Sequence, residues 1–524
     1  MPHAVSMPSP GIQALILCGP GSSFPTFTSN PDENPKALLP IANRPMVWYP
    51  IDFCYRTGIT NLLLRLADDN RRHHLDLSPS ASNAIGTALK TNPFLTGLPH
   101  PRPDLLAPQD LDQNTGTAEI LRFTRVTSDF VVLPCDLVCE LGGDKLLQAW
   151  MVKAATGLMT EDESPGAAAV WVCATSIKGE ETDFIATAPL AQPLMPSAKD
   201  SLLPQLSKLA LSMPKDSMKD VVEEKGQLSV LTTHRDAHIY ILPRWTMDFI
   251  SANPRLESIG EDVIGWWAKA GWQPALAEKL GIKKIAEGRS TEDQGHSDDH
   301  GDSVPPSPTT HEQSPEASPS RQTYARRSLA PSKVKEDVPP LLAYIHPSAQ
   351  PDAPLIRRVD NAKLLLAVSL QLAKLLSIEE VGLDAASVYA HAKKVAYPEG
   401  VKPRTTITRQ DTLIADNVMV EEKTSIKECV IGANCQIREG AKLFQCLLMD
   451  GVVVGKGCKL TRCILGKRSD IGEGSTLTDC EVQENLLVEP KTEEKENKLM
   501  SSDGLEATEQ EMEEFLGDDE VAIA

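Results

Sequence analysis

Three consecutive stretches of 17 residues decide the fold of the C-terminal half: IKECVIGANCQIREGAK (426–442), LFQCLLMDGVVVGKGCK (443–459) and LTRCILGKRSDIGEGST (460–476). Within each stretch the apolar positions follow one another at steps of five or six residues. This spacing predicts three short strands per coil, each with one inward side chain, and hexapeptide-type repeats of this kind are typical of a parallel β-helix. The matching positions in successive coils are Ile426, Leu443, Leu460 and Leu477, then Ile431, Leu448, Leu465 and Val482, then Ile437, Val454 and Ile471.

Each coil of such a solenoid can bury its apolar row only by stacking on its neighbours, so the periodic region forms one structural unit. We assign residues 405–484 to this unit, with the clearest periodicity beginning near residue 412. An open β-helix also has strand edges and an exposed wall, which favour pairing with a partner protein.

Four cysteines share the 17-residue interval, and they allow two interpretations. In the first they are small hydrophobic residues stacked along the solenoid wall. In the second they bind a metal, but a metal needs ligands that converge on one point, whereas a column separates them by about 4.8 Å per coil. We therefore favour a structural role and no metal site for Cys429, Cys446, Cys463 and Cys480.

The overall composition argues against an exported protein, a general nucleic-acid binder and a membrane-spanning protein. The 524 residues include 11 cysteines, an odd number, and the N-terminus lacks the pattern of an export signal, which predicts a reduced, cytosolic protein. A net charge of −20 argues against a general nucleic-acid binder, which needs a basic surface. No apolar run approaches the roughly 20 residues that span a bilayer. We therefore expect no direct nucleic-acid partner and no membrane.

Alternating strands and helices are predicted for a second domain, over residues 12–286. The apolar run at 12–17 leads into a loop that contains Gly19 and Gly21, which is the usual opening of an α/β nucleotide-binding fold. Further apolar strands are predicted at 61–66, 130–134 and 237–242. Strands that alternate with helices in this way predict a mostly parallel sheet with right-handed crossovers.

Composition divides the remaining residues. Near 187–230 the sequence mixes Pro, Ser and Lys, which predicts an insertion within the α/β domain. Residues 287–340 are rich in Ser, Pro and Asp and predict a disordered insert. Residues 341–404 are expected to be a connector that packs against the solenoid. Glu and Asp dominate 485–524, which predicts a disordered acidic tail.

Several motifs occur in the order seen in sugar-nucleotide pyrophosphorylases: Gly19-Pro20-Gly21-Ser22-Ser23, Pro35-Lys36 with Leu39-Pro40, Asn114-Thr115-Gly116-Thr117-Ala118, and Cys135-Asp136. The chain resembles that family over 12–285 and 405–484. The resemblance implies a nucleotidyltransferase-like, Rossmann-like α/β domain followed by a left-handed parallel β-helix. In such a site a glycine loop binds phosphates, cations neutralise the charge that develops in phosphoryl transfer, and a carboxylate holds Mg²⁺.

The sequence departs from the family's pattern at the residues that carry catalysis. The family's loop reads Gly-Gly-x-Gly-Thr-Arg, whereas this chain has Cys18 in place of the first Gly and Ser23 in place of the Arg. Asp236-Ala237-His238 replaces the family's Asn-Ala-Gly at the sugar site. Because an arginine clamp on phosphate can raise the rate by orders of magnitude, we expect no catalytic residue and no bound metal. The resemblance leaves a vestigial nucleotide site at Gly19, Gly21, Lys36, Gly116, Thr117 and Asp136.

Three further stretches are more informative, namely 35–50, in which Trp48-Tyr49-Pro50 is the most specific part, 236–240 and 258–264. They resemble the gamma subunits of eukaryotic translation initiation factor 2B. The resemblance implies a non-catalytic scaffold that pairs with the epsilon subunit, joins the other 2B subunits and supports GDP/GTP exchange on initiation factor 2. In that family the exchange activity lies in an extra helical-repeat domain of epsilon, for which we expect no room after the solenoid.

Two functions therefore remain open at the level of sequence. The first is this regulatory, non-catalytic subunit, which requires no cofactor. The second is a pyrophosphorylase-like enzyme or nucleotide-sugar-binding protein, which Lys36 and Asp136 favour and which Cys18, Ser23 and His238 oppose. Residual nucleotide binding by Gly19, Gly21, Lys36 and Asp136 is a separate hypothesis.

Overall fold

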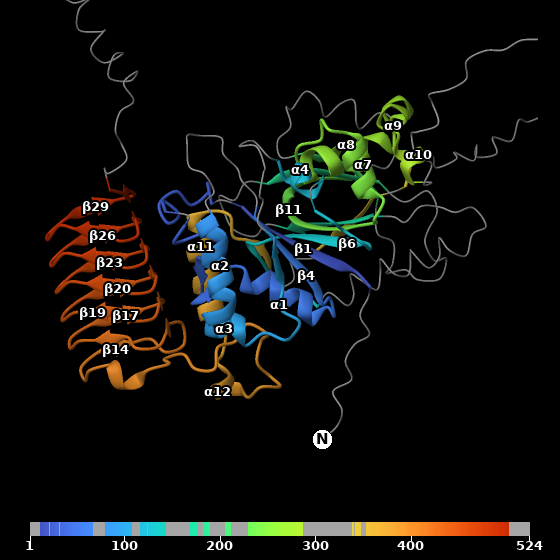
Figure 1. Ribbon diagram of the computed structural model, residues 1–524. Helices are drawn as coiled ribbons and strands as arrows, with labels where there is room; N and C mark the ends of the chain where they lie inside the picture. The colour runs from blue at the N-terminus through green and yellow to red at the C-terminus, as the bar shows by residue number, and fades with distance from the viewer. Residues whose placement is uncertain are drawn as a thin grey trace, which may run out of the picture.

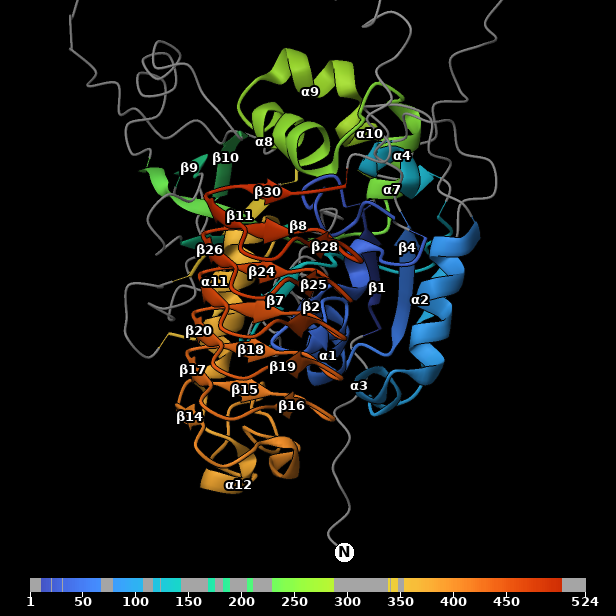
Figure 2. The same ribbon diagram turned by 90° about the vertical axis from the view of Figure 1, so that its left-hand side faces the viewer.

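The chain folds into an α/β domain and a β-solenoid that stand side by side (Figures 1 and 2). The computed structural model describes residues 11–19, 21–30, 32–66, 79–106, 116–122, 124–142, 168–174, 182–188, 205–210, 229–286, 338–339, 341–346 and 353–501.

A nine-stranded sheet forms the centre of the α/β domain. Its first four strands are parallel, as predicted, while the far half is mixed, because β11 pairs antiparallel with β6, β8 and β9. Apolar side chains bury β4, β1 and β6 on both faces, which is usual for parallel strands inside a sheet, whereas β5 lies at the edge. The strand order is β5 (Asp104–Leu106), β4 (Asn61–Leu66), β1 (Gln13–Cys18), β6 (Phe130–Pro134), β11 (Ser229–Leu242), β8 (Ala168–Ala174), β12 (Leu341–Ile345), β10 (Gln205–Ala210) and β9 (Asp183–Ala188).

The two faces of the sheet bury separate cores because successive side chains along a strand point to opposite sides. From β1, Ala14 and Ile16 join one core, and Leu15 joins the other. The first core also receives side chains of α1 (Trp48–Arg56), α2 (Pro79–Thr91), α3 (Pro93–Thr96) and α11 (Ala362–Ala373). The second receives those of α4 (Thr117–Arg122), α7 (Thr246–Ala252), η3 (Ile259–Ile264), α8 (Gly265–Ala270), α9 (Pro274–Leu280) and α10 (Ile282–Ala286).

The solenoid consists of three parallel sheets, one for each side of the coil, and its ladder runs at the predicted register of 17 residues. The first sheet comprises β14 (Thr406–Ile407), β17 (Ser425–Lys427), β20 (Lys442–Phe444), β23 (Lys459–Thr461), β26 (Thr476–Thr478) and β29 (Glu493–Lys495). The second comprises β15 (Leu413–Ile414), β18 (Val430–Ile431), β21 (Leu447–Leu448), β24 (Ile464–Leu465), β27 (Glu481–Val482) and β30 (Lys498–Leu499). The third comprises β16 (Met419–Val420), β19 (Gln436–Ile437), β22 (Val453–Val454), β25 (Asp470–Ile471) and β28 (Leu487–Val488).

The corners of the coil repeat as strictly as its strands. Residues with left-handed φ recur at the 17-residue interval, for example Asn417, Asn434, Gly451, Arg468 and Asn485. For most residues the left-handed conformation costs on the order of 1 kcal/mol. Asn adopts it at a lower cost, and Gly adopts it without this penalty. The repeated corners therefore fix where each strand ends.

The cysteine column is part of the solenoid core. Each of its four thiols donates a hydrogen bond to the backbone carbonyl two residues earlier, at 3.0–3.3 Å. All four side chains are buried. These contacts agree with the structural role that was predicted for Cys429, Cys446, Cys463 and Cys480.

The second solenoid sheet faces the α/β domain. Its outward row joins the core that contains α11 and the α1 side of the nine-stranded sheet. In Figures 1 and 2, α11 lies between this wall and the α/β sheet. One wall of the solenoid is thus covered within the chain itself, by contacts of Leu413, Val430, Leu447 and Ile464.

The family-specific Trp48-Tyr49-Pro50 stretch builds a second part of this interface. The rings of Trp48 and Tyr49 pack edge-on against Tyr389, with centroids 6.0 and 5.0 Å away. The guanidinium of Arg44 lies over Trp48 and donates to the backbone carbonyls of Tyr389 and Ala390 at 2.9 and 2.8 Å. The stretch therefore attaches the segment after α11 to the α/β domain.

Smaller elements complete the architecture. A two-stranded pairing joins β13 (Ile356–Arg358) to β7 (Leu137–Cys139), directly after β6. The remaining short elements are η1 (Lys36–Leu38), β2 (Pro40–Ile41), β3 (Arg44–Pro45), α12 (Ile378–Val381) and η5 (Pro398–Gly400).

The structure corrects three of the predicted boundaries. Residues 341–345, assigned to the connector 341–404, form β12 between β8 and β10 in the main sheet. The solenoid, predicted over 405–484, begins with bridges at Val395 and Val401 and continues through β30. Residues 485–499, assigned to the acidic tail 485–524, are therefore a further coil.

A local change in sequence explains why the last coil was missed. Glu494 and Asn497 occupy the positions of Leu477 and Cys480 one coil earlier, so the first apolar row and the cysteine column end, although Val488 and Leu499 continue the other two rows and the backbone ladder persists. Within the insertion near 187–230, β10 and the start of β11 join the sheet. The rest of that insertion, the insert 287–340 except 338–339, and the tail beyond 501 lie outside the described residues.

Candidate functional site

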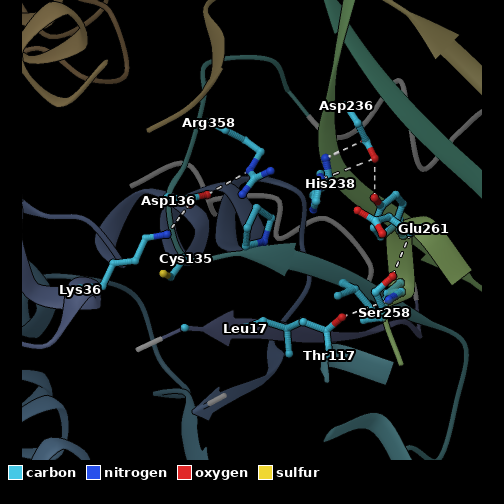
Figure 3. Close-up of a pocket in the computed structure, with 16 residues that line it drawn as sticks. Leu17, Lys36, Thr117, Cys135, Asp136, Asp236, His238, Ser258, Glu261 and Arg358 are labelled. Carbon is cyan, nitrogen blue, oxygen red and sulfur yellow. Dashed lines mark hydrogen bonds and ion pairs between the residues drawn. The ribbon is translucent and has the colours of Figure 1, made fainter. Parts of the chain in front are cut away.

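A cavity of about 310 Å³ opens at the carboxyl ends of β1 and β6, where open α/β sheets usually bind their ligands. Its walls come from distant parts of the chain, including η1, α4, β11, η3 and β13 (Figure 3). The residues that line it are Leu17, Gly19, Lys36, Thr117, Val132, Pro134, Cys135, Asp136, Asp236, His238, Tyr240, Ser258, Ile259, Gly260, Glu261 and Arg358.

Asp136 lies between the two cations of the cavity. The Nζ of Lys36 is 2.7 Å from its Oδ2, and the Nε of Arg358 is 3.3 Å from its Oδ1. Both cations point at the carboxylate from opposite sides in Figure 3. The Asp136 side chain is 1% exposed. One buried carboxylate therefore engages both positive charges that line the cavity.

This ion cluster shifts the pKa of all three groups. Burial works against the charged form of Asp136, but Lys36 and Arg358 together hold the pKa of this carboxyl well below its usual range. Burial lowers the pKa values of Lys36 and Arg358, but the combined attraction of neighbouring groups, with Asp136 foremost, raises both pKa values above their usual range. All three groups are charged at neutral pH, and their charges compensate one another.

A second carboxylate, Asp236, lies on the opposite wall. Its Oδ2 accepts a hydrogen bond from the Tyr240 hydroxyl, and its Oδ1 accepts the backbone N–H of His238 at 2.8 Å. Burial raises the pKa of Asp236 to about 7. His238 has a left-handed φ of 53° and a pKa lowered by burial and by Arg358. Asp236 therefore titrates near neutrality, in contrast to Asp136.

The third wall forms where α4 meets η3. The Thr117 hydroxyl accepts the backbone N–H of Ile259 at 3.0 Å, and the Ser258 hydroxyl caps η3 by accepting from Glu261 and Asp262. A Cβ on Gly116 would lie 2.2 Å from the carbonyl oxygen of Glu257. Gly116 is therefore required for close packing of the backbone.

The loop after β1 turns away from the cavity. The carbonyl of Gly21 accepts the N–H of Phe24 and the hydroxyl of Thr28, and Phe24 and Phe27 are buried in the first core. Gly21 has a left-handed φ of 96°, and a Cβ at this residue would lie 2.9 Å from side-chain atoms of Thr28. The loop is thus a compact turn closed on its own side chains.

The next residues of this loop bind the solenoid. Glu484, which is buried, accepts hydrogen bonds from the Ser29 hydroxyl at 3.0 Å, the Asn30 N–H at 3.1 Å and the Asn34 amide at 2.6 Å. Thr26 donates to Glu481 at 2.9 Å. The segment that follows the glycine loop is therefore attached to the last coils of the solenoid.

The structure brings four of the six predicted site residues to the cavity. Gly19, Lys36, Thr117 and Asp136 line it, whereas Gly21 and Gly116 serve the turn and the close packing described above. Their role in nucleotide binding stays a prediction. Cys18 points into the first core, where a hydrogen bond to Cys135 and burial raise its pKa.

Arg358 was missed from the sequence. It belongs to β13, in the stretch assigned to a connector, and reaches the cavity only because β13 pairs with β7 next to Asp136. A pair of adjacent arginines, Arg357 and Arg358, in a short apolar strand was the available signal. Nothing in the sequence around this arginine pair indicated that it lies next to Asp136.

Two features are absent from the part of the chain that the structure describes. In these residues no group of three or more His, Cys, Asp or Glu side chains is placed to hold a metal ion. No helix among them has both the length and the apolar character that crossing a bilayer requires.

Comparison with known proteins adds two findings. Residues 394–493 match the family model described as "EIF2B subunit epsilon LbH domain". A curated relative, "Translation initiation factor eIF2B subunit gamma" of Schizosaccharomyces pombe, is 24% identical over 277 residues. The chain is therefore similar to eIF2B gamma subunits. The match covers 52% of this chain and 54% of the relative, so the chain spans about half the length of the relative it matches.

These findings confirm the resemblance that the sequence indicated. They also support the left-handed β-helix as the class of the solenoid, since the matched family is an LbH domain. The family match extends from 394 to 493, so it includes the bridge at Val395 and most of the coil beyond 484.

Proposed function

We propose that this eIF2B gamma-like chain is a non-catalytic scaffold subunit of the guanine-nucleotide exchange factor for translation initiation factor 2. It pairs with the epsilon subunit and the other 2B subunits in the cytosol and supports GDP/GTP exchange without performing it. The proposal builds on the similarity to eIF2B gamma and on the LbH match.

The ion cluster at Asp136 carries the non-catalytic part of the proposal. Phosphoryl transfer needs cations that are free to neutralise charge on the transferring group. Here Lys36 and Arg358 are both paired with Asp136 at 2.7 and 3.3 Å. A ligand phosphate would have to compete with a buried carboxylate for both cations.

The segment that follows the glycine loop supports the same conclusion. Residues 24–34 pack into the first core and onto Glu484 instead of lying over the cavity. In place of the family's loop arginine, Ser23 is a short, neutral side chain. Residues 24–34 therefore contribute to the contact between the α/β domain and the solenoid.

The solenoid supports a scaffold role. One of its three sheets is covered by α11, while the other two present outward side chains that include the exposed Met419, Phe444 and Leu487. Exposed apolar side chains on a regular, rigid wall suit a binding surface for other subunits.

Affinity purification tests this function. The tagged chain is recovered from its own cytosol at mild salt, its partners are identified by mass, and GDP release from initiation factor 2 is measured with the recovered material. Recovery of four other subunits with exchange activity is the expected result. Recovery of the chain alone, without exchange activity, would overturn the proposal.

A second candidate, a nucleotide- or nucleotide-sugar-binding protein, is favoured by one observation. The cavity of about 310 Å³ lies at the position where α/β folds bind nucleotides, and Lys36, Thr117 and Asp136 all line it. Calorimetric titration with GTP, GDP and nucleotide sugars tests the second candidate. Absence of heat at millimolar ligand would eliminate the second candidate, and saturable heat would support it.

A further inference from the structure

A groove with a cavity of about 800 Å³ lies at the opposite end of the solenoid from β30, between α12 and the first coil. None of its lining residues lines the α/β cavity. Five cations line it, namely Lys393, Lys394, Lys402, Arg404 and Arg409, against two acids, Glu379 and Glu380. The lining is therefore positively charged in a chain whose net charge is −20.

Three of these cations have no carboxylate within 4.0 Å in the described part of the chain, namely Lys393, Lys402 and Arg409. The other two are engaged. Arg404 is 4.0 Å from Glu422, and Lys394 donates to the carbonyl oxygens of Ala373 and Gln410. Of the acids, Glu380 accepts the N–H and the hydroxyl of Ser377, both at 2.8 Å. The groove thus presents unpaired positive charge.

Exposed apolar side chains occur in the segment that contributes several lining residues to the groove. Ten large hydrophobic side chains are exposed among the described residues, and four of them belong to the segment 376–397, parts of which line the groove. Leu376 and Tyr397 are chain neighbours of the lining residues Ser377 and Pro398. Their exposed fractions are 55% for Leu376, 76% for Leu383, 49% for Val388 and 37% for Tyr397. Such clustering marks a binding surface.

The chain itself contains a segment with the complementary chemistry. Residues 502–524 carry nine Asp and Glu and no Lys or Arg. Within them the sequence Glu511-Met512-Glu513-Glu514-Phe515-Leu516 places three apolar residues at i, i+3 and i+4 among acids. In a helical turn these three would share one face. An acidic segment with one apolar face suits a basic groove with an apolar rim.

The length of the chain allows this segment to reach the groove. From the bridge at Val395 to β30 the ladder makes six steps of about 4.8 Å, or about 29 Å. Residues 502–511, fully extended, span about 33 Å. Met512 and the residues after it can therefore lie at the first coil.

We propose that the acidic segment around Met512–Leu516 docks in this groove of the same molecule, with its apolar face on the Leu376–Tyr397 rim and its carboxylates on Lys393, Lys402 and Arg409. The segment then covers an apolar surface that is otherwise exposed and shields a charged end of the solenoid. Because both the groove and the segment lie outside the α/β cavity, this inference does not depend on the proposed function.

Zero-length cross-linking of the full-length chain tests the contact. A carbodiimide joins carboxylates to amines that touch them, and mass spectrometry identifies the joined peptides. We expect cross-links from Lys393 or Lys402 to Glu511, Glu513 or Glu514. Equal amounts of unlabelled and ¹⁵N-labelled chain are mixed first, so that mixed-isotope peptides report contact between two copies. Cross-links confined to one isotope support the proposal, whereas mixed-isotope cross-links overturn it in favour of a second copy.

Three variants make the result specific while leaving the reporting lysines in place. Two double variants should each lower the cross-link yield about tenfold if the segment is tethered at millimolar effective concentration. The first is Arg404→Glu with Arg409→Glu, and the second is Met512→Ser with Phe515→Ser. The control pair, Lys442→Glu and Lys459→Glu, changes the same charge at exposed positions on another wall. Equal yields in the groove variant and the control would overturn the proposal.

Lysine acetylation gives an independent readout. Lys393 and Lys402 should react about tenfold more slowly in the full chain than in a chain that ends at residue 501, because the tethered acidic segment covers them most of the time. Lys442 serves as the internal reference in both. Identical rates for the groove lysines in the two chains would contradict docking.

Discussion

The solenoid and the α/β cavity place their charged and apolar groups by different rules. In the solenoid a side chain's environment is set by the residues 17 positions before and after it, as the cysteine column shows. In the cavity Asp136 contacts Lys36 and Arg358, which are 100 residues before and 222 residues after it. In a periodic fold the contacting residues are therefore a fixed, short distance apart in the sequence, whereas the contacts of the cavity depend on the topology of the whole domain.

The same contrast appears in what each region does with charge. Solenoid ion pairs such as Arg462–Asp479 lie on exposed side chains of neighbouring coils. The cavity pair and the Glu484 cluster are buried and join segments far apart in sequence. Buried, fully partnered charges cost much more to disrupt than exposed ones. Changes to the buried charges should therefore reduce stability more than changes to the exposed ones.

Replacement of Asp136 by Asn should have the largest effect. Lys36 and Arg358 would lose their common counter-charge in a buried site, which typically costs about 3–5 kcal/mol in the free energy of unfolding. Urea unfolding of the purified chain, followed by tryptophan fluorescence, measures the loss. The matched solenoid variant, Asp479→Asn, breaks an exposed pair and should leave the unfolding curve within error. Equal losses in both would remove the distinction between the regions.

Replacement of Leu460 by Ala tests the solenoid core. The side chain is buried between Leu443 and Leu477, so the cavity left behind should cost about 2–5 kcal/mol. Because the Leu460 side chain lies inside the solenoid and packs on the neighbouring coils, hydrogen exchange should rise mainly in those coils and not in the α/β sheet. The exposed Met419→Ala is the control. Exchange that rises throughout both domains would show that the solenoid is not a separate unit.

Replacement of Glu484 by Ala should release the loop 24–34. Three hydrogen bonds into a buried carboxylate are lost, and the donors of Ser29, Asn30 and Asn34 lose their partner, at a cost of about 1–3 kcal/mol. Faster hydrogen exchange in peptides from this loop is the expected observation. Glu473→Ala, at an exposed solenoid position, should not change it. An unchanged loop in the Glu484 variant would contradict the attachment.

The smallest effect at pH 6 is expected for Asp236→Asn. The amide can still accept from Tyr240, so the cost there should be under about 1 kcal/mol. The folded pKa of Asp236, about 7, exceeds its unfolded value of about 3.9, so the folded state holds an extra proton between these values. That contribution to stability is complete below pH 4 and is lost as the pH rises to 7. Thermal unfolding from pH 5 to pH 8 should therefore depend less on pH in the variant, and parallel profiles would refute the assignment.

The sequence was most informative where contacts are local. The 17-residue rows predicted the inward side chains Leu443, Leu448 and Val454, and all of them lie in the solenoid core. The prediction stopped one coil early because Glu494 and Asn497 break the apolar pattern while the backbone pairing persists. Side-chain periodicity therefore gives the core of a solenoid more reliably than its ends.

The cavity could be predicted only in part. Lys36 and Asp136 were identified through motifs that follow predicted strands, and the carboxyl ends of parallel strands meet at one edge. Arg358 and β12 could not be placed, because their partners, β7 and β8, lie about 200 residues away in sequence. The attachment of loop 24–34 to Glu484 was hidden for the same reason, since no short-range pattern links them.

Pyrophosphate release tests the central claim, that the charges of the cavity maintain the structure instead of catalysing transfer. The purified chain is incubated with Mg²⁺, each nucleoside triphosphate and a panel of sugar phosphates, and released pyrophosphate is measured over hours. Because Lys36 and Arg358 are both held by Asp136, the account predicts no release above a control without protein. Sustained turnover with any substrate pair would contradict this expectation and would show that the chain is an active enzyme like the pyrophosphorylases that it resembles.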